Sequence, residues 1–186
     1  MTERYAQDSM VIGVDLRNEI RGDLMHLNRA NWGKGGKNDW HLAATNAGNL
    51  ILKSDPDQLI LVEGLNFALD MDPIRSKPVI LEIPNKLVYS FHLYSFSCFD
   101  FKEYDDFKDK MTQKYGYILE EGHDYTAPLW LGEFGENTQN EWWQFTIQYL
   151  EETDISWAYW AYTGYKNEPT GEDNDETYGI VDSTFK

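Results

Sequence analysis

The stretch Ala127-Pro-Leu-Trp-Leu-Gly-Glu-Phe-Gly135 decides how the rest of the chain is interpreted. Its apolar residues 129–131 are typical of a buried strand, and Glu133 stands where that strand ends. An unpaired charge in an apolar wall is costly, by several kcal/mol. Glu133 therefore needs either a basic partner, which would make it structural, or a substrate, which would make it functional.

A second carboxyl group has the same setting. The segment Met10-Val-Ile-Gly-Val-Asp-Leu-Arg-Asn-Glu19 is another apolar strand that ends in a polar cluster, with Glu19 as its last residue. Two glutamates at strand ends are a candidate pair of acid and nucleophile.

Five strands are predicted, and they alternate with helices or long crossovers: 10–16, 59–63, 87–94, 128–134 and 155–162. This alternation is typical of a parallel sheet in an α/β fold. The carboxyl ends of parallel strands lie at one edge of the sheet. We therefore expect the polar and aromatic residues that follow these strands to converge there: Glu19, His92, Tyr94, Glu133 and Trp160.

The segments between the strands carry helix and loop signals. Apolar residues at helical spacing predict a helix over 40–51, with Asn38 or Asp39 as its N-cap. Further helices are expected over 101–119 and after the capping box Thr138-x-x-Glu141. The remaining long connections are interpreted as loops, one at 22–36 with an exposed Trp32 and one at 64–86.

Composition narrows the function. The 186 residues have room for one domain, and a net charge of −16 argues against nucleic acid or an anionic membrane as partner. No run of 18 apolar residues predicts a membrane span, and residues 1–9 contain no apolar signal-peptide core. The single cysteine, Cys98, is expected to be a small buried side chain.

No metal or cofactor is predicted. The histidines outside the strands, His26, His41 and His123, have no partner at metal-ligand spacing. The acidic residues Asp173 and Glu176 belong to a segment without the full calcium-loop pattern, so a solvated acidic loop is the expectation.

Four short motifs in order resemble the second half of a cellulase of glycoside hydrolase family five. They are Val11-Ile-Gly-Val-Asp-Leu-Arg-Asn18-Glu19, His92-Leu-Tyr94, Trp130-Leu-Gly-Glu133-Phe-Gly135 and Trp157-Ala-Tyr-Trp160. The resemblance extends over nearly the whole chain, including Trp40-His-Leu-Ala-Ala and Leu61-Val-Glu63-Gly. Each motif alone is weak, and their shared order at strand ends carries the signal.

The resemblance implies a TIM (β/α)8 barrel of which residues 1–186 form a part, about strands four to eight. The first three strands and the last covering helix of the family's catalytic domain have no counterpart. The implied activity is retaining hydrolysis of β-1,4-glucosidic bonds in cellulose or related β-glucans, without a cofactor. Glu19 would be the general acid/base and Glu133 the nucleophile, with their carboxyl groups roughly 5–5.5 Å apart.

The same resemblance assigns substrate contacts. Asn18 would bind the sugar 2-OH, His92 and Tyr94 would hold the nucleophile and sugar hydroxyls, and Trp160 would stack on a sugar ring. Trp32 is equally well a sugar-binding platform or an ordinary loop residue. Three further positions have a structural interpretation: a core histidine remains an alternative for His92, Trp157 is expected in the core, and Glu63 is expected to be a paired structural acid.

The implied partner is a β-glucan polysaccharide or oligosaccharide, and the missing N-terminal half of the barrel is a second candidate partner. The resemblance implies a family of extracellular proteins, whereas the location of this chain itself is left open. An isolated half-barrel is expected to hydrolyse soluble β-glucan very poorly, and the same residues in a complete barrel to do so well. Two alternatives stay open, namely an inactive remnant that at most binds glucan, and a β-mannan-active relative.

Overall fold

The computed structural model describes residues 2–6, 8–22, 29–97, 100–164 and 177–181. Cys98, His26, Asp173 and Glu176 lie outside the described residues, and the expectations for them stay predictions. The chain forms two compact units. Unit 1 comprises Met1–Phe91 and Met111–Trp130, and unit 2 comprises His92–Lys110 and Leu131–Lys186.

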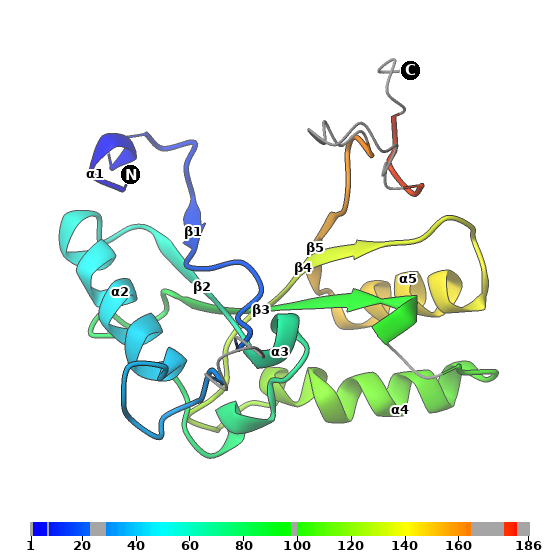
Figure 1. Ribbon diagram of the computed structural model, residues 1–186, viewed down its shortest axis with the longest axis horizontal. Helices are drawn as coiled ribbons and strands as arrows, with labels where there is room; N and C mark the ends of the chain where they lie inside the picture. The colour runs from blue at the N-terminus through cyan, green and yellow to red at the C-terminus, as the bar shows by residue number, and fades with distance from the viewer. Residues whose placement is uncertain (1, 7, 23–28, 98–99, 165–176, 182–186) are drawn as a thin grey trace. The chain divides into compact units, whose positions relative to one another are not determined.

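A five-stranded sheet has the order β1-β2-β3-β4-β5, so each strand neighbours the strand before it in sequence (Figure 1). The β1–β2 and β2–β3 pairs are parallel, as predicted. This sequential order is the order of strands in a barrel built from βα repeats. The strands are β1 Gly13–Asp15, β2 Leu59–Glu63, β3 Leu87–Tyr94, β4 Leu129–Gly135 and β5 Ser156–Tyr159.

Helices and 3-10 turns connect the strands. The α-helices are α1 Thr2–Tyr5, α2 Trp40–Ser54, α3 Leu65–Ala68, α4 Tyr104–Lys114 and α5 Glu141–Thr153. The 3-10 turns are η1 Asp72–Arg75, η2 Ser95–Ser97 and η3 Gly116–Leu119. Within the described residues, no helix combines the length and apolar character needed to cross a bilayer.

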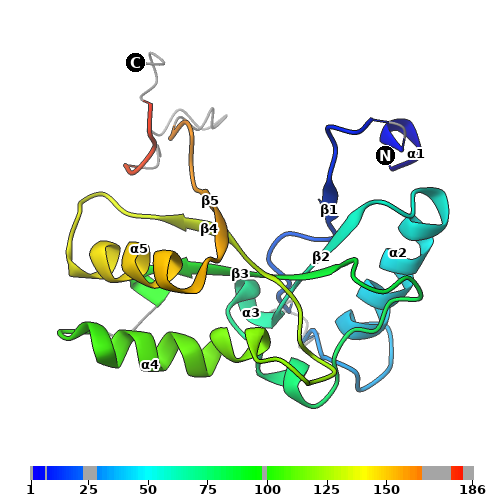
Figure 2. The same ribbon diagram turned by 180° about the vertical axis from the view of Figure 1, so that it is seen from behind.

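In unit 1, helix α2 lies beside strand β2 in both views (Figure 1, Figure 2). The helix begins after Asp39, whose side chain accepts a hydrogen bond from the Leu42 amide at 3.2 Å, and this decides between the two predicted N-caps. On its buried face, Gly48 allows close packing, because a Cβ there would lie 3.0 Å from a methyl carbon of Ile60. Ile60 is fully buried.

Unit 1 also anchors the connection between β2 and β3. Tyr117 donates its hydroxyl to the Met71 carbonyl at 2.8 Å, and the Arg75 guanidinium lies 3.3 Å from the centre of the Tyr117 ring. Beside them, Phe91 and Tyr115 stack with ring centres 4.2 Å apart. The predicted loop 64–86 is thus a fixed connection that contains α3 and η1.

In unit 2, α4 packs against α5 through aromatic rings. Phe107 is fully buried, with ring-centre distances of 5.9 Å to Phe145 and 6.2 Å to Tyr149. A salt bridge of 2.7 Å between Lys108 and Glu152 joins the same helices at the surface. Phe145 and Tyr149 belong to the apolar face that the helical spacing predicted for α5, and these contacts turn that face toward α4.

Several predicted boundaries are wrong. Strand β1 covers only residues 13–15 instead of 10–16, and Met10 and Ile12 are 85% and 73% exposed. Strand β5 ends at Tyr159 instead of residue 162, and the helix expected over 101–119 is α4 followed by η3. The capping box at Thr138 is also wrong, because the Asn140 side chain accepts the hydrogen bond from the Trp143 amide at 2.9 Å.

Candidate active site

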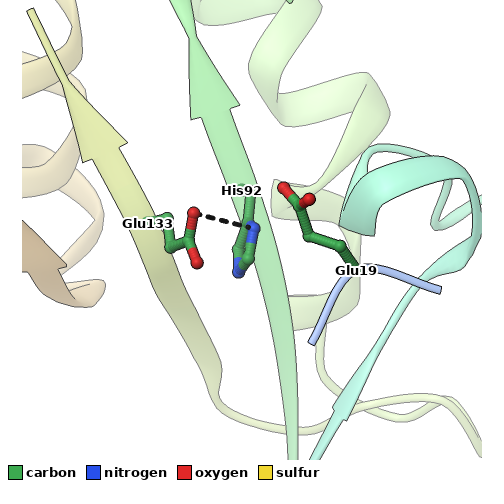
Figure 3. A group of neighbouring side chains, drawn as sticks. All are labelled: Glu19, His92 and Glu133. Atoms are coloured by element: carbon green, nitrogen blue, oxygen red, sulfur yellow. Dashed lines mark ion pairs between the residues drawn. The ribbon is translucent and has the colours of Figure 1, made fainter. Parts of the chain in front are cut away.

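Glu133 lies on strand β4, and two side chains of β3 meet its carboxyl group. The Tyr94 hydroxyl donates to Glu133 Oε2 at 2.9 Å. His92 Nδ1 lies 3.5 Å from the same oxygen, and a dashed line joins this pair in Figure 3. His92 and Tyr94 are two positions apart on a strand, so both point to one side of it. All three residues belong to unit 2. The predicted contact of His92 and Tyr94 with Glu133 is therefore present.

The burial of this group favours a fixed carboxyl orientation. The His92 side chain is 3% exposed, while that of Glu133 is 16% exposed and so still reaches solvent. A carboxylate that accepts a hydrogen bond from a neutral hydroxyl is held in one orientation, and the short Tyr94 contact is the stronger of the two. His92 forms an ion pair with Glu133 only when its imidazole is protonated.

Aromatic rings extend this group beyond the strand. Phe96, in η2, stacks on Tyr94 with ring centres 5.1 Å apart and is 79% exposed. Tyr178 lies 6.3 Å from Tyr94 by ring centres. Sequence reasoning missed Phe96, and the only signal for it is an aromatic residue two positions after the last residue of β3.

The end of β5 presents Trp160 to solvent. Trp160 is 42% exposed, and its amide donates to the Phe134 carbonyl at 2.9 Å. The peptide bond between Trp160 and Ala161 is cis. Gly135 is required beside it, because a Cβ at this position would collide with the Trp160 carbonyl oxygen.

Trp157 is not the core residue that was predicted. It is 50% exposed, and it contacts Phe134 edge-on with ring centres 5.4 Å apart. The buried ring in this group is Phe134, which is fully buried and also stacks on Trp143, and Trp157 packs against it from the solvent side.

Glu19 lies in unit 1, in the segment that follows β1. Together with Asn18, it lines a hollow of about 230 Å³ formed by residues 17–21. Its backbone has φ of 49°, in the left-handed region that residues other than glycine rarely adopt. The Glu19 amide donates to Glu63 Oε2 at 2.6 Å.

Glu63, the last residue of β2, is 1% exposed. Besides its side-chain contact with Glu19, its carbonyl oxygen accepts a hydrogen bond from Trp40 Nε1 at 2.8 Å. Burial and hydrogen bonding agree with the structural interpretation of Glu63. The sequence did not indicate that its partner is the main chain of Glu19.

Trp32 was predicted to be exposed, and that prediction is wrong. It is 5% exposed, donates its ring N–H to the Lys77 carbonyl at 2.7 Å, and packs edge-on against His41. The loop turns inward because Asp39 accepts hydrogen bonds from the amides of Gly33 and Gly35, both at 2.7 Å. A ring buried in this way has no open face for a sugar.

Glu136 lies one residue beyond β4, in unit 2. Burial acts to raise its pKa, but hydrogen bonds from the Ser95 side chain, the Asn137 amide and the Asn140 side chain outweigh this and hold the pKa below its ordinary value. This carboxyl group therefore stays ionised. The Tyr159 hydroxyl donates to the main-chain carbonyl oxygen of Glu136 at 3.4 Å.

The fold is shared with glycoside-cleaving barrels. An endocellulase from Pyrococcus horikoshii, solved as a variant in complex with cellotetraose, matches with a TM-score of 0.75 at 24% identity. The match covers 100% of this chain and 56% of that one. The chain thus has the α/β fold of a partial (β/α)8 barrel, as the sequence predicted.

Sequence comparison then gives the family. An endoglucanase of Paenibacillus polymyxa is 31% identical over 185 residues, which are 87% of this chain and 44% of that protein. A major extracellular endoglucanase of Xanthomonas campestris pv. campestris is 27% identical, over 87% of this chain and 36% of that protein. The chain spans less than half the length of these relatives.

The family model that matches, over residues 1–167, is cellulase (glycosyl hydrolase family 5). The chain belongs to this family, which confirms the predicted resemblance.

Proposed function

We propose that this chain contributes the acid/base and the nucleophile to retaining hydrolysis of β-1,4-glucosidic bonds in a β-glucan. The observation that carries the proposal is the Glu133 carboxyl group, which accepts the Tyr94 hydroxyl at 2.9 Å in a chain of glycosyl hydrolase family 5. In this proposal, Glu133 is the nucleophile and Glu19 the general acid/base.

The reaction has two balanced steps. In the first, a Glu133 oxygen bonds to the anomeric carbon while the glycosidic bond breaks, and Glu19 gives its proton to the departing oxygen. In the second, Glu19 takes a proton from water, the water oxygen bonds to the anomeric carbon, and Glu133 leaves as a carboxylate. Each glutamate returns to its first protonation state.

His92 and Tyr94 orient the nucleophile in this scheme. A carboxylate aimed by a hydroxyl at 2.9 Å loses less freedom at the moment of attack than one that turns in solvent. The same donor hydrogen-bonds the carboxylate that departs in the second step. We also propose that His92 and Tyr94 contact sugar hydroxyls.

Glu19 acts on the departing oxygen, and Asn18 acts on the sugar that carries the anomeric carbon. Asn18 is exposed and lines the hollow at residues 17–21, where it would bind the sugar 2-OH. Glu19 belongs to unit 1 and Glu133 to unit 2. The separation of roughly 5–5.5 Å that retention requires stays a prediction.

Trp160 would supply the stacking face, because it is 42% exposed beside the end of β5. A β-1,4-glucan is the proposed substrate, since two relatives are endoglucanases and a structural neighbour was solved with cellotetraose. One of these relatives is named extracellular, and we propose the same location for this protein.

The decisive experiment measures release of reducing sugar from soluble β-glucan by the purified chain, alone and with the rest of a family 5 barrel fused upstream of Met1. We expect very low turnover alone and robust turnover in the fusion. Glu133→Gln should abolish turnover in both forms.

Two other outcomes have defined meanings. Cellotetraose binding without turnover in either form would favour the inactive glucan-binding alternative. Faster turnover of β-mannan than of cellulose or mixed-linkage glucan by the fusion would favour the mannan-active alternative.

A further inference from the structure

We propose that Glu63 is a positioning residue for Glu19, and that its buried carboxyl group holds the Glu19 main chain in the conformation that aims the acid. The inference rests on the proposed role of Glu19 and adds a residue to it. Glu63 itself need not contact the substrate.

The contact is direct and comes from a fixed part of the fold. Glu63 Oε2 accepts the Glu19 amide at 2.6 Å, although 44 positions separate the two residues. The Glu63 side chain cannot easily withdraw, because the residue is 1% exposed and its carbonyl is bonded to Trp40 Nε1. The next residue, Gly64, packs so closely against the Asp70 carbonyl oxygen that a Cβ there would collide with it.

Glu19 needs such a restraint. Its φ of 49° lies in the left-handed region, which the Cβ of an L-residue disfavours. Strained conformations of this kind persist where the surroundings enforce them, and they are concentrated at functional sites.

A second bond secures the neighbouring peptide. The Phe67 amide donates to the Ile20 carbonyl at 3.2 Å, and Ile20 also forms a parallel bridge with Leu65. The end of β2 and the segment that follows it therefore hold the Glu19–Ile20 main chain twice, because Glu63 accepts one hydrogen bond from it and Phe67 donates another to it.

The consequence concerns proton transfer. A general acid works only within hydrogen-bond reach of the atom it protonates. If the Glu63 contact is removed, the Glu19 backbone can relax toward negative φ, and the side chain then starts from a different direction. Glu63 should therefore affect the acid step selectively and leave the nucleophile on β4 intact.

The first test reads the hydrogen bond without activity. In the 15N-labelled 186-residue chain, we expect the Glu19 amide to exchange its hydrogen at least about tenfold faster in Glu63→Leu than in the unmodified chain. Glu63→Gln keeps an acceptor oxygen and should stay within about threefold. The Trp160 amide, bonded to Phe134 in unit 2, is the internal control for folding. Equal Glu19 exchange in the Leu variant and the unmodified chain would overturn the proposal.

The second test reads the acid step. In the fusion with an upstream barrel half, Glu63→Leu should lower kcat/KM on aryl β-cellobiosides by about 10²-fold for poor leaving groups and by less than about threefold for dinitrophenolate, which departs without protonation. Glu63→Gln should recover most of the loss. Equal losses on both substrates would refute a positioning role.

Two controls keep the result decisive. If Glu63→Leu does not fold, Glu63→Asp carries the same expectations, because it keeps the carboxyl group but withdraws it by one methylene. If the fusion with an upstream barrel half turns over neither substrate before Glu63 is changed, the proposed function fails, while the exchange result still decides the Glu63 contact.

Discussion

Glu19 and Glu133 are held in different ways. Glu133 is fixed through its side chain, whose Oε2 accepts the Tyr94 hydroxyl and lies near His92 Nδ1. Glu19 is fixed through its main chain, whose amide donates to Glu63 and whose φ is positive. The first residue stands within a regular strand, and the second follows a strand of only three residues.

This difference suits the two proposed roles. A nucleophile keeps the same ionised form until it bonds, so donors aimed at its oxygens support it throughout. A general acid/base must lose and regain a proton, and a main-chain restraint can aim it without contacting the carboxyl group that changes. The comparison predicts that substitutions at Glu133 and its side-chain partner change activity differently from substitutions at Glu19 and its main-chain partner.

The largest effect is expected for Glu133, the residue that is held through its side chain. Glu133→Gln removes the attacking carboxylate and should lower kcat by roughly 10⁴-fold or more in the fusion with an upstream barrel half. Cellotetraose affinity, measured by calorimetry, should change little. Residual activity near that of the unmodified enzyme would exclude Glu133 as nucleophile.

Glu19→Gln should separate two classes of substrate. Loss of the general acid costs about 10²–10⁴-fold on substrates with poor leaving groups. Dinitrophenyl cellobioside should still be cleaved at a similar first-step rate, which a burst of dinitrophenolate would report. An equal loss on both substrates would remove Glu19 from the acid role.

Tyr94→Phe sharpens the comparison by removing one donor and keeping the ring that stacks on Phe96. A hydrogen bond to a charged group contributes about 1.5–3 kcal/mol, so kcat/KM should fall by roughly 10–100-fold. The thermal midpoint should move little. If activity is unchanged, the 2.9 Å contact does not orient the nucleophile.

Like Glu63, Asp39 accepts hydrogen bonds from main-chain amides with its carboxyl group, but it lies outside the proposed catalytic residues. Asp39→Ala removes the acceptor for three amides and should lower the free energy of unfolding by about 1–2 kcal/mol. Although burial acts to raise the pKa of Asp39, hydrogen bonds from the Gly33, Gly35 and Leu42 amides lower it below 3.8.

The sign of the pH dependence of Asp39 follows from that shift. The folded-state pKa is below the unfolded value, so the stabilisation is present above about pH 3.8 and is lost as pH falls through the lowered pKa. Urea unfolding at pH 7 and pH 3 should show a smaller gap between the unmodified chain and Asp39→Ala at the lower pH. A pH-independent gap would contradict this.

The smallest effect is expected for the exposed ion pair between Lys108 and Glu152 in unit 2. Hydrogen bonds from Lys108, Gln148 and Tyr104 lower the pKa of Glu152 from 4.5 to about 2. Its contribution to stability is therefore present above about pH 4.5 and disappears as pH falls toward 2. Glu152→Gln should lower the thermal midpoint slightly at pH 7 and leave it unchanged near pH 2, provided that salt is held constant.

The sequence predicted those parts of the fold that depend on local pattern. Strands β2 and β3 have the predicted bounds, because each is an apolar run followed by a turn residue or a 3-10 turn. Helix α2 begins after Asp39, one of the two predicted N-caps, since a capping side chain before an apolar helical pattern is a local signal. The order of the motifs along the strands was sufficient for the family.

What the sequence did not predict depends on partners far along the chain. The Trp32 ring donates a hydrogen bond to the Lys77 carbonyl, 45 positions away, and the Glu63 carboxyl group accepts one from the Glu19 amide, 44 positions away. Before β1, the apolar pattern of residues 10–12 did not reveal that the side chains of Met10 and Ile12 are exposed. Periodicity records which face is apolar, but it does not record what covers that face.

The close approach of Gly135 to the Trp160 carbonyl has a consequence for attempts to diversify this protein. Even a single methyl group at position 135 would have to push the neighbouring backbone away and move the indole with it. A saturation library should therefore show this position to be as intolerant as the glutamates, although glycine brings no reactive group to the reaction.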